Sequence, residues 1–190
     1  MEVLPTIGFN VTFDDGATSN NEPVRETLDW PTFGSAMREL ARQVVNSGWM
    51  PDLIVAVARG GLLPAGAISY AMGVKAIGTM NVEFYTDVAQ TLPEPVLLPP
   101  LMDVSALEGK KVLVVDDVAD SGKTLKMVME LIDEHGLSLD GKSTVTVDAK
   151  SAVIYEKSRS VIKPDFVWKH TDLWINFPWS TLPPVQSDDR

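Results

Sequence analysis

Apolar residues recur along this chain with two different spacings, and these spacings predict an alternation of helices and strands. From Trp30 to Gly48 they return every three or four positions, which is typical of an amphipathic helix. Two further helices are expected, over residues 64–72 before Gly73 and after residue 121 up to Gly136. The expected buried positions are Phe33, Met37, Leu40, Ala41, Val44 and Val45 in the first helix and Leu125, Val128, Met129 and Ile132 in the last.

Short unbroken apolar runs lie between these helices. Residues 53–58 are a run of this kind, and residues 111–115 are apolar after Lys111. Residues 74–82 are expected to form the next strand, and another strand is expected within residues 144–155. Apolar strands joined to helices by glycine turns are typical of βαβ units, whose sheet is covered on both faces. The pattern therefore predicts a single α/β domain with a mainly parallel sheet.

The regions outside this pattern set the expected domain limits. Residues 1–28 have no sustained period and are expected to form a weakly structured arm or hood, with a short strand at residues 7–13. The domain itself is expected over residues 29–182, followed by a tail at residues 183–190. Residues 83–108 contain four prolines and no Lys or Arg. A segment of this length is expected to be a functional lid or a partner contact.

The composition excludes several classes of function. The chain of 190 residues has a formal net charge of −10, which argues against a general affinity for nucleic acid or an anionic membrane. It has no cysteine and two histidines, so thiolate chemistry and a histidine metal cluster are excluded. No stretch supplies the ~20 apolar residues that a membrane-spanning helix requires. We therefore expect a soluble, cytoplasmic protein.

One segment places carboxylates at the edge of the predicted sheet where ligands collect. The apolar run at residues 112–115 ends in Asp116 and Asp117, at the carboxyl end of a strand. Residues 118–124 then offer a tight turn, two hydroxyls, a glycine and the first amides of a helix, which together suit a phosphate. Acids beside an anion site must face hydroxyl groups or a metal. The expected ligand is therefore a phosphorylated sugar that chelates Mg²⁺.

Two simpler interpretations of this segment are weaker. Gly122, Lys123 and Thr124 resemble the end of an ATP-binding P-loop, but that motif requires a glycine where this chain has Asp117. The acids could also serve only to cap the helix. One acid would fit that role easily, whereas three acids followed by Ser-Gly-Lys-Thr fit it poorly.

The same segment carries a specific resemblance. Residues 112–125, VLVVDDVADSGKTL, resemble the signature of the type I phosphoribosyltransferases for 5-phosphoribosyl-1-pyrophosphate (PRPP). Residues 52–61 are similar to the strand and pyrophosphate loop of the purine members. Residues 155–157 and 163–179 resemble the purine-binding hood of the xanthine-guanine and hypoxanthine branch. The resemblance covers most of residues 29–182 and implies a mainly parallel sheet flanked by helices, with a small hood over the base site.

The resemblance implies transfer of the phosphoribosyl group of PRPP to a 6-oxopurine, with Mg²⁺ as cofactor. Asp116 and Asp117 would bind the ribose hydroxyls and help to hold Mg²⁺, and Asp120 would be the general base at the purine N7. Arg59, with the amides of Gly60 and Gly61, would bind pyrophosphate beside a strained or cis peptide. The implied 5′-phosphate loop is Ala119, Asp120, Ser121, Gly122, Lys123 and Thr124.

For the base, Lys157 matches the lysine that donates to the purine O6, and Trp174 matches the aromatic residue that stacks on the ring. Ile175 would supply backbone contacts. An ammonium group aimed at a carbonyl oxygen selects an oxo over an amino substituent, so adenine should be a poor substrate. Lys150 has a similar neighbourhood and is the alternative to Lys157. The alternative for Trp174 is an aromatic residue that only packs in the core.

Some expectations stay open. The lid of this family usually offers serine, tyrosine and a basic residue, whereas here Tyr85 and Thr86 lead into the proline-rich segment, which could equally serve a subunit interface. The alternatives in function are a non-catalytic regulatory protein that senses PRPP and a transferase for another acceptor, such as a pyrimidine. By family analogy we expect a homodimer or homotetramer.

Overall fold

The computed structural model describes residues 23–81, 96–98, 108–138 and 144–187. The expected strand at residues 7–13 and most of the proline-rich segment lie outside these residues. Among the helices of the described part, none is long and apolar enough to cross a membrane.

A six-stranded sheet forms the centre of the structure, with strand order β4-β3-β2-β5-β8-β9. Five of its strands are parallel: β2 (Leu53–Ala58), β3 (Ile77–Asn81), β5 (Lys111–Ala119), β8 (Asp148–Glu156) and β9 (Phe166–His170). The edge strand β4 (Val96–Leu98) is antiparallel to β3. The prediction of a mainly parallel sheet is confirmed, and β4 shows that part of the proline-rich segment returns to the edge of the sheet.

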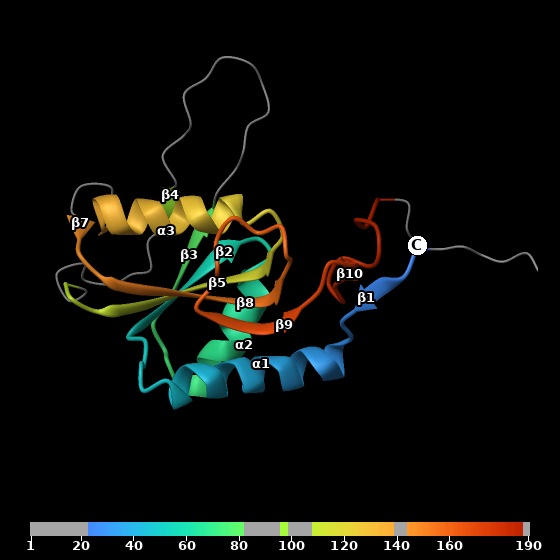
Figure 1. Cartoon of the computed structure of the whole chain (residues 1–190), viewed down its shortest axis with the longest axis horizontal. Coiled ribbons are helices and arrows are strands. Elements are labelled where there is room, and N and C mark those ends of the chain that lie inside the picture. Colours follow the sequence, from blue (N-terminus) through green and yellow to red (C-terminus); the bar gives the residue numbers. More distant parts are fainter. Residues whose placement is uncertain (1–22, 82–95, 99–107, 139–143, 188–190) are drawn as a thin grey trace, which may run out of the picture.

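Three helices cover the two faces of this sheet (Figure 1). Helices α1 (Trp30–Asn46) and α2 (Leu62–Met72) pack on one face, and α3 (Lys123–His135) packs on the other. The side chain of Asp29 accepts a hydrogen bond from Thr32 N at 2.8 Å and caps α1. The predicted face of α1 is buried except for Val45, which is 46% exposed because it lies about 100° around the helix from Val44.

A second, smaller sheet joins the two ends of the described chain. Strand β1 (Arg25–Thr27) pairs in parallel with β10 (Trp174–Asn176). We call this pair the hood, and Figure 1 shows it beside the carboxyl ends of the main strands. Glu26 ties the hood to the sheet, since it accepts from Lys169 Nζ at 2.7 Å and from the Tyr155 hydroxyl at 3.4 Å. A third sheet pairs β6 (Leu137–Ser138) with β7 (Thr144–Val145).

One strand prediction at the site was too short. The apolar pattern placed the end of a strand at residue 115, whereas β5 continues through both acids to Ala119. The extension occurs because β8 runs alongside it, pairing Val118 with Tyr155 and Ala119 with Glu156. Asp116 and Asp117 therefore belong to a rigid strand, and Asp120 is the first residue beyond it.

Candidate active site

Asp116 and Asp117 form a partly buried acid pair near the end of β5. Asp116 Oδ1 accepts a hydrogen bond from Asp117 N at 2.9 Å. Burial, with the charge of Asp117 as a second cause, raises the pKa of Asp116 to about 8, and burial raises the pKa of Asp117 to about 6. A cation or hydroxyl donors placed here would relieve the cost of ionising both groups.

The turn after β5 leads directly into α3. Gly122 is buried, has a φ of 71°, and begins the helix without a side-chain cap. The carbonyl of Ser121 accepts from Val161 N at 3.0 Å, which fixes the turn against the segment after β8. The amide of Lys123, the first residue of α3, makes a long hydrogen bond of 3.4 Å to Ser121 Oγ, and the start of this helix is the kind of place where an anion such as phosphate can bind.

The turn between β2 and α2 lies against the acid pair. The peptide bond between Ala58 and Arg59 is cis, as the resemblance implied, and the Arg59 side chain is exposed. A Cβ atom on Gly60 would overlap the carboxylate of Asp117, so only glycine allows this approach. The structure therefore brings the predicted pyrophosphate loop next to the predicted ribose site.

A cleft of about 230 Å³ opens between the end of β5 and the hood. Lys157 reaches into it with a side chain that is 7% exposed, and its Nζ lies 3.5 Å from Asp120 Oδ2. Trp174 is 65% exposed at the cleft, which contradicts the alternative that it only packs in the core. The lining residues are Val118, Asp120, Lys157, Trp174, Ile175, Asn176, Phe177 and Ser180.

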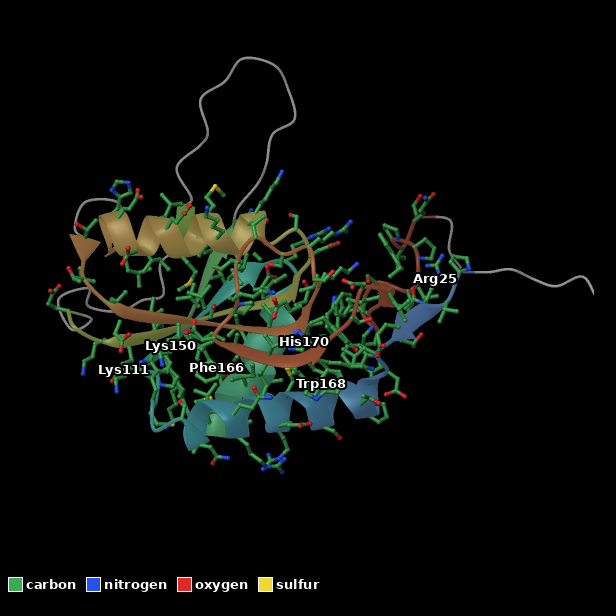
Figure 2. The ribbon with its side chains drawn as sticks, viewed as in Figure 1. Arg25, Lys111, Lys150, Phe166, Trp168 and His170 are labelled. Carbon is green, nitrogen blue, oxygen red and sulfur yellow. The ribbon has the colours of Figure 1, made fainter. Side chains whose placement is uncertain are left out.

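The alternative lysine lies elsewhere. Lys150 lies on β8, seven residues before Lys157. Its Nζ lies over the rings of Trp49 and Phe166, at 5.3 and 5.8 Å from their centroids. Figure 2 shows Lys150 beside Lys111 and Phe166, at the end of the sheet away from Arg25 of the hood. The predictions for Tyr85 and Thr86 lie outside the described residues.

Sequence reasoning missed one charged neighbour of the site. Arg159 donates from Nε to Asp120 Oδ1 at 2.6 Å. It stands two residues after Lys157, and that proximity to an assigned cation was the available signal. Asn176, at the end of β10, and Phe177 and Ser180, just after it, were also missed as lining residues, because the local pattern does not show which side of this segment faces the cleft.

The acid pair suits a hard divalent cation that is shared with a substrate. Within the described residues, no group of three or more His, Cys, Asp and Glu side chains surrounds a position suited to a metal. Two carboxylates alone leave the octahedron of Mg²⁺ incomplete, and proteins usually complete it with substrate phosphates and water. The oxygen donors of Asp116 and Asp117 fit that arrangement.

The turn before α3, the acid pair and the cleft of about 230 Å³ lie together at the carboxyl ends of parallel strands, where open α/β sheets bind their ligands. Residues 23–184 match the family described as phosphoribosyl transferase domain. The chain belongs to this family, and it is a phosphoribosyltransferase.

Several relatives are purine enzymes. The chain is 31% identical to the xanthine-guanine phosphoribosyltransferase of Gluconobacter oxydans, over 83% of this chain and 85% of the relative. The enzyme of the same name from Idiomarina loihiensis is 32% identical over 80% of this chain and 84% of its own. The purine phosphoribosyltransferase of Pyrococcus horikoshii has a similar structure, with a TM-score of 0.65 and 32% identity, covering 86% of this chain and 99% of its own.

Proposed function

We propose that the protein transfers the 5-phosphoribosyl group of PRPP to guanine, xanthine or hypoxanthine, as a purine salvage enzyme. The products are a purine nucleoside 5′-monophosphate and pyrophosphate. The observation that carries this proposal is the buried Lys157 ammonium, which lies beside Asp120 and over the ring of the exposed Trp174. The names of the relatives from Gluconobacter, Idiomarina and Pyrococcus support a purine acceptor.

Trp174 stacks on the base, and backbone groups beside Ile175 contact its far edge. Lys157 donates to O6, which an amino group at that carbon could not accept in the same way. The purine N9 attacks C1 of the sugar, the bond from C1 to the pyrophosphate oxygen breaks, and its electron pair leaves with pyrophosphate. The proton on N7 passes to the carboxylate of Asp120, so the nucleotide forms without a charged purine.

The other half of the site binds PRPP. Asp116 and Asp117 accept hydrogen bonds from the ribose hydroxyls and would help to hold Mg²⁺. Arg59 and the amides of the following turn bind pyrophosphate, and residues 119–124 bind the 5′-phosphate at the start of α3. Mg²⁺, when bound, neutralises part of the pyrophosphate charge. Preorganised groups of this kind stabilise the sugar cation that develops as the bond breaks.

A panel of acceptors tests the proposal. The protein would be incubated with PRPP and Mg²⁺, and with guanine, xanthine, hypoxanthine, adenine, uracil or orotate in turn, and pyrophosphate would be measured. Release with a 6-oxopurine and not with adenine is expected. If none of these bases causes pyrophosphate release, the result would favour a regulatory protein that senses PRPP. Release with orotate or uracil would favour a pyrimidine acceptor.

A variant tests the role of Asp120. Asp120→Asn keeps the size of the side chain and should fold normally, yet lose turnover by about 10²- to 10⁴-fold. Full activity in this variant would exclude Asp120 as the base. The same assay without Mg²⁺, in the presence of a chelator, checks the metal requirement.

We also propose a homodimer or homotetramer. Helix α2 has exposed apolar side chains on its outer face, among them Leu62, Leu63 and Tyr70, the last 92% exposed. Exposed apolar patches of this kind often mark subunit contacts. Light scattering coupled to size exclusion would give the mass in solution, and a monomer at micromolar concentration would reject the proposal.

The cytoplasmic location stays a prediction that cell fractionation would check.

A further inference from the structure

The carboxylate of Asp120 is held by two cations that come from one turn. Arg159 Nε donates to Oδ1 at 2.6 Å, and a second guanidinium nitrogen of Arg159 pairs with the same oxygen. Lys157 Nζ lies 3.5 Å from the other oxygen, Oδ2. With both oxygens engaged, the plane of the carboxylate is fixed even though Asp120 itself lies on a loop.

The two cations differ in their access to the base. Lys157 is 7% exposed and lines the cleft, whereas the Arg159 side chain is 67% exposed and is not among the lining residues. A 6-oxopurine stacked on Trp174 draws Lys157 towards its O6. Arg159 can then remain with Asp120, because the purine does not occupy its place.

The turn that carries Arg159 is itself anchored. Asp172 Oδ1 accepts from Ser158 N at 2.9 Å and from Ser158 Oγ at 2.8 Å. These hydrogen bonds, and after them the charges of Lys157 and Arg159, hold the pKa of Asp172 below its usual value. The anchor is therefore ionised at neutral pH. Two backbone hydrogen bonds join the turn to the phosphate loop, from Lys157 N to Ala119 O at 3.1 Å and from Val161 N to Ser121 O at 3.0 Å.

The ion pair between Arg159 and Asp120 contributes little to the stability of the fold, because exposed pairs of this kind are screened by solvent. Its effect is on orientation. A general base must meet its proton within hydrogen-bonding distance and in the right direction, and small errors in position slow the reaction.

We propose that Arg159 is a positioning residue for proton transfer. It keeps the Asp120 carboxylate directed at the purine N7 after the purine oxygen has engaged Lys157. This inference rests on the proposed function, in which Asp120 is the base. It adds a residue outside the cleft to the machinery of the reaction.

The first test measures the chemical step in a single turnover, with enzyme in excess over the preferred purine and saturating PRPP and Mg²⁺. In Arg159→Ala the rate should fall about fivefold to tenfold, the loss expected for a base held less firmly. The dissociation constant of the purine should stay within about twofold of the wild type, since Arg159 does not contact the base. The matched control is Arg42→Ala, which removes an exposed arginine from α1 and should keep the wild-type rate.

Two further measurements separate positioning from a general structural effect. Added guanidinium ion should restore part of the rate of Arg159→Ala, and Arg159→Lys should be faster than the alanine variant. In an Asp120→Asn background, Arg159→Ala should change the residual rate by less than about twofold, because it acts through the group that is already lost.

The outcomes distinguish this inference from the proposed function. A wild-type protein that forms no nucleotide with any base refutes the proposed function itself. An active wild type, together with an Arg159→Ala rate within twofold of it, overturns only the role of Arg159. The role of Arg159 is also overturned if Arg159→Ala lowers the rate equally in the wild-type and Asp120→Asn backgrounds. It is overturned as well if guanidinium does not restore the rate of Arg159→Ala and Arg159→Lys is as slow as the alanine variant.

Discussion

The ammonium group of Lys157 lies over the Trp174 indole, 5.9 Å from the ring centroid. Lys157 comes directly after β8 and Trp174 begins β10, so this relationship joins the main sheet to the hood. A purine that stacks on Trp174 presents its polar edge to a cation that is already in place. Recognition of the ring and recognition of its oxygen therefore depend on one arrangement.

Replacing Trp174 by leucine should weaken base binding alone. Stacking of a base on an aromatic side chain is worth about 1 to 3 kcal/mol, so the KM of the purine should rise by about 5- to 150-fold. The KM of PRPP should change little, and Trp174→Phe should recover part of the loss. Steady-state kinetics with each substrate varied in turn measures both constants, and an equal rise in the KM of PRPP would contradict the role.

Lys157→Met should remove the preference for an oxo group at C6 while preserving the length of the side chain. Loss of a charged donor to O6 should reduce kcat/KM for the best 6-oxopurine by about 10- to 100-fold, whereas the low activity with adenine should change less. Lys150→Met is the control, since Lys150 lies on β8, the strand that leads to Lys157, but faces Trp49 and Phe166 instead of the cleft. If the two variants lose activity equally, Lys157 does not select the base.

The acid pair should make the metal-free protein less stable as the pH rises. In the folded protein burial raises the pKa of Asp116 to about 8 and that of Asp117 to about 6, both above the ordinary aspartate pKa of 3.8. The folded state thus favours the protonated acids, so the stability present below about pH 4 is lost as the pH rises from there through the folded pKa values of about 6 and 8.

Asp116→Asn tests this relationship, because the amide cannot ionise and its Oδ1 can still accept from Asp117 N. Denaturant unfolding without Mg²⁺ or PRPP should show a gain of about 1 to 2 kcal/mol at pH 8.5 and almost none at pH 4. The variant should also bind PRPP with Mg²⁺ more weakly. Equal stability of the wild type and the variant across this pH range would contradict the prediction that the acid pair destabilises the metal-free protein as the pH rises.

Gly60→Ala should damage the PRPP site through a single methyl group. The added Cβ would overlap the Asp117 carboxylate, which must then move from the ribose site. We expect PRPP affinity in calorimetry to fall about tenfold or more. Gly66→Ala is the control: its Cβ would meet nothing within 4 Å, and alanine inside α2 should stabilise the helix by about 0.5 to 1 kcal/mol.

The local parts of this site could be predicted from the sequence. The apolar runs and the acid pair predicted the strand and turn correctly, because the residues of a phosphate loop are contiguous. The length of β5 could not be predicted, since Asp116 and Asp117 break the apolar pattern and the strand stays extended through its pairing with β8, up to Ala119 opposite Glu156.

Contacts between distant segments were the least predictable. Arg159 looked like an ordinary surface residue, and its hydrogen bond to Asp120 depends on how two loops meet at the edge of the sheet. The contact of Glu26 with Lys169 and Tyr155 likewise joins segments from opposite ends of the domain. The pattern of polar and apolar residues along the sequence does not predict such contacts between distant segments.

The parallel pairing of β1 with β10 has a consequence for the order in which the protein matures on the ribosome. Strand β5 and helix α3 are translated before residue 136, but β8, which keeps the end of β5 extended, and residues 157–161, which hold the turn after β5, follow later. Trp174, which pairs with Arg25, is translated later still. The contacts that hold the end of β5 and the turn after it are therefore available once residue 161 has been translated, before β10 supplies Trp174. Purine binding therefore requires a strand that is translated near the end of the chain, and a chain released from the ribosome before β10 would not bind the base.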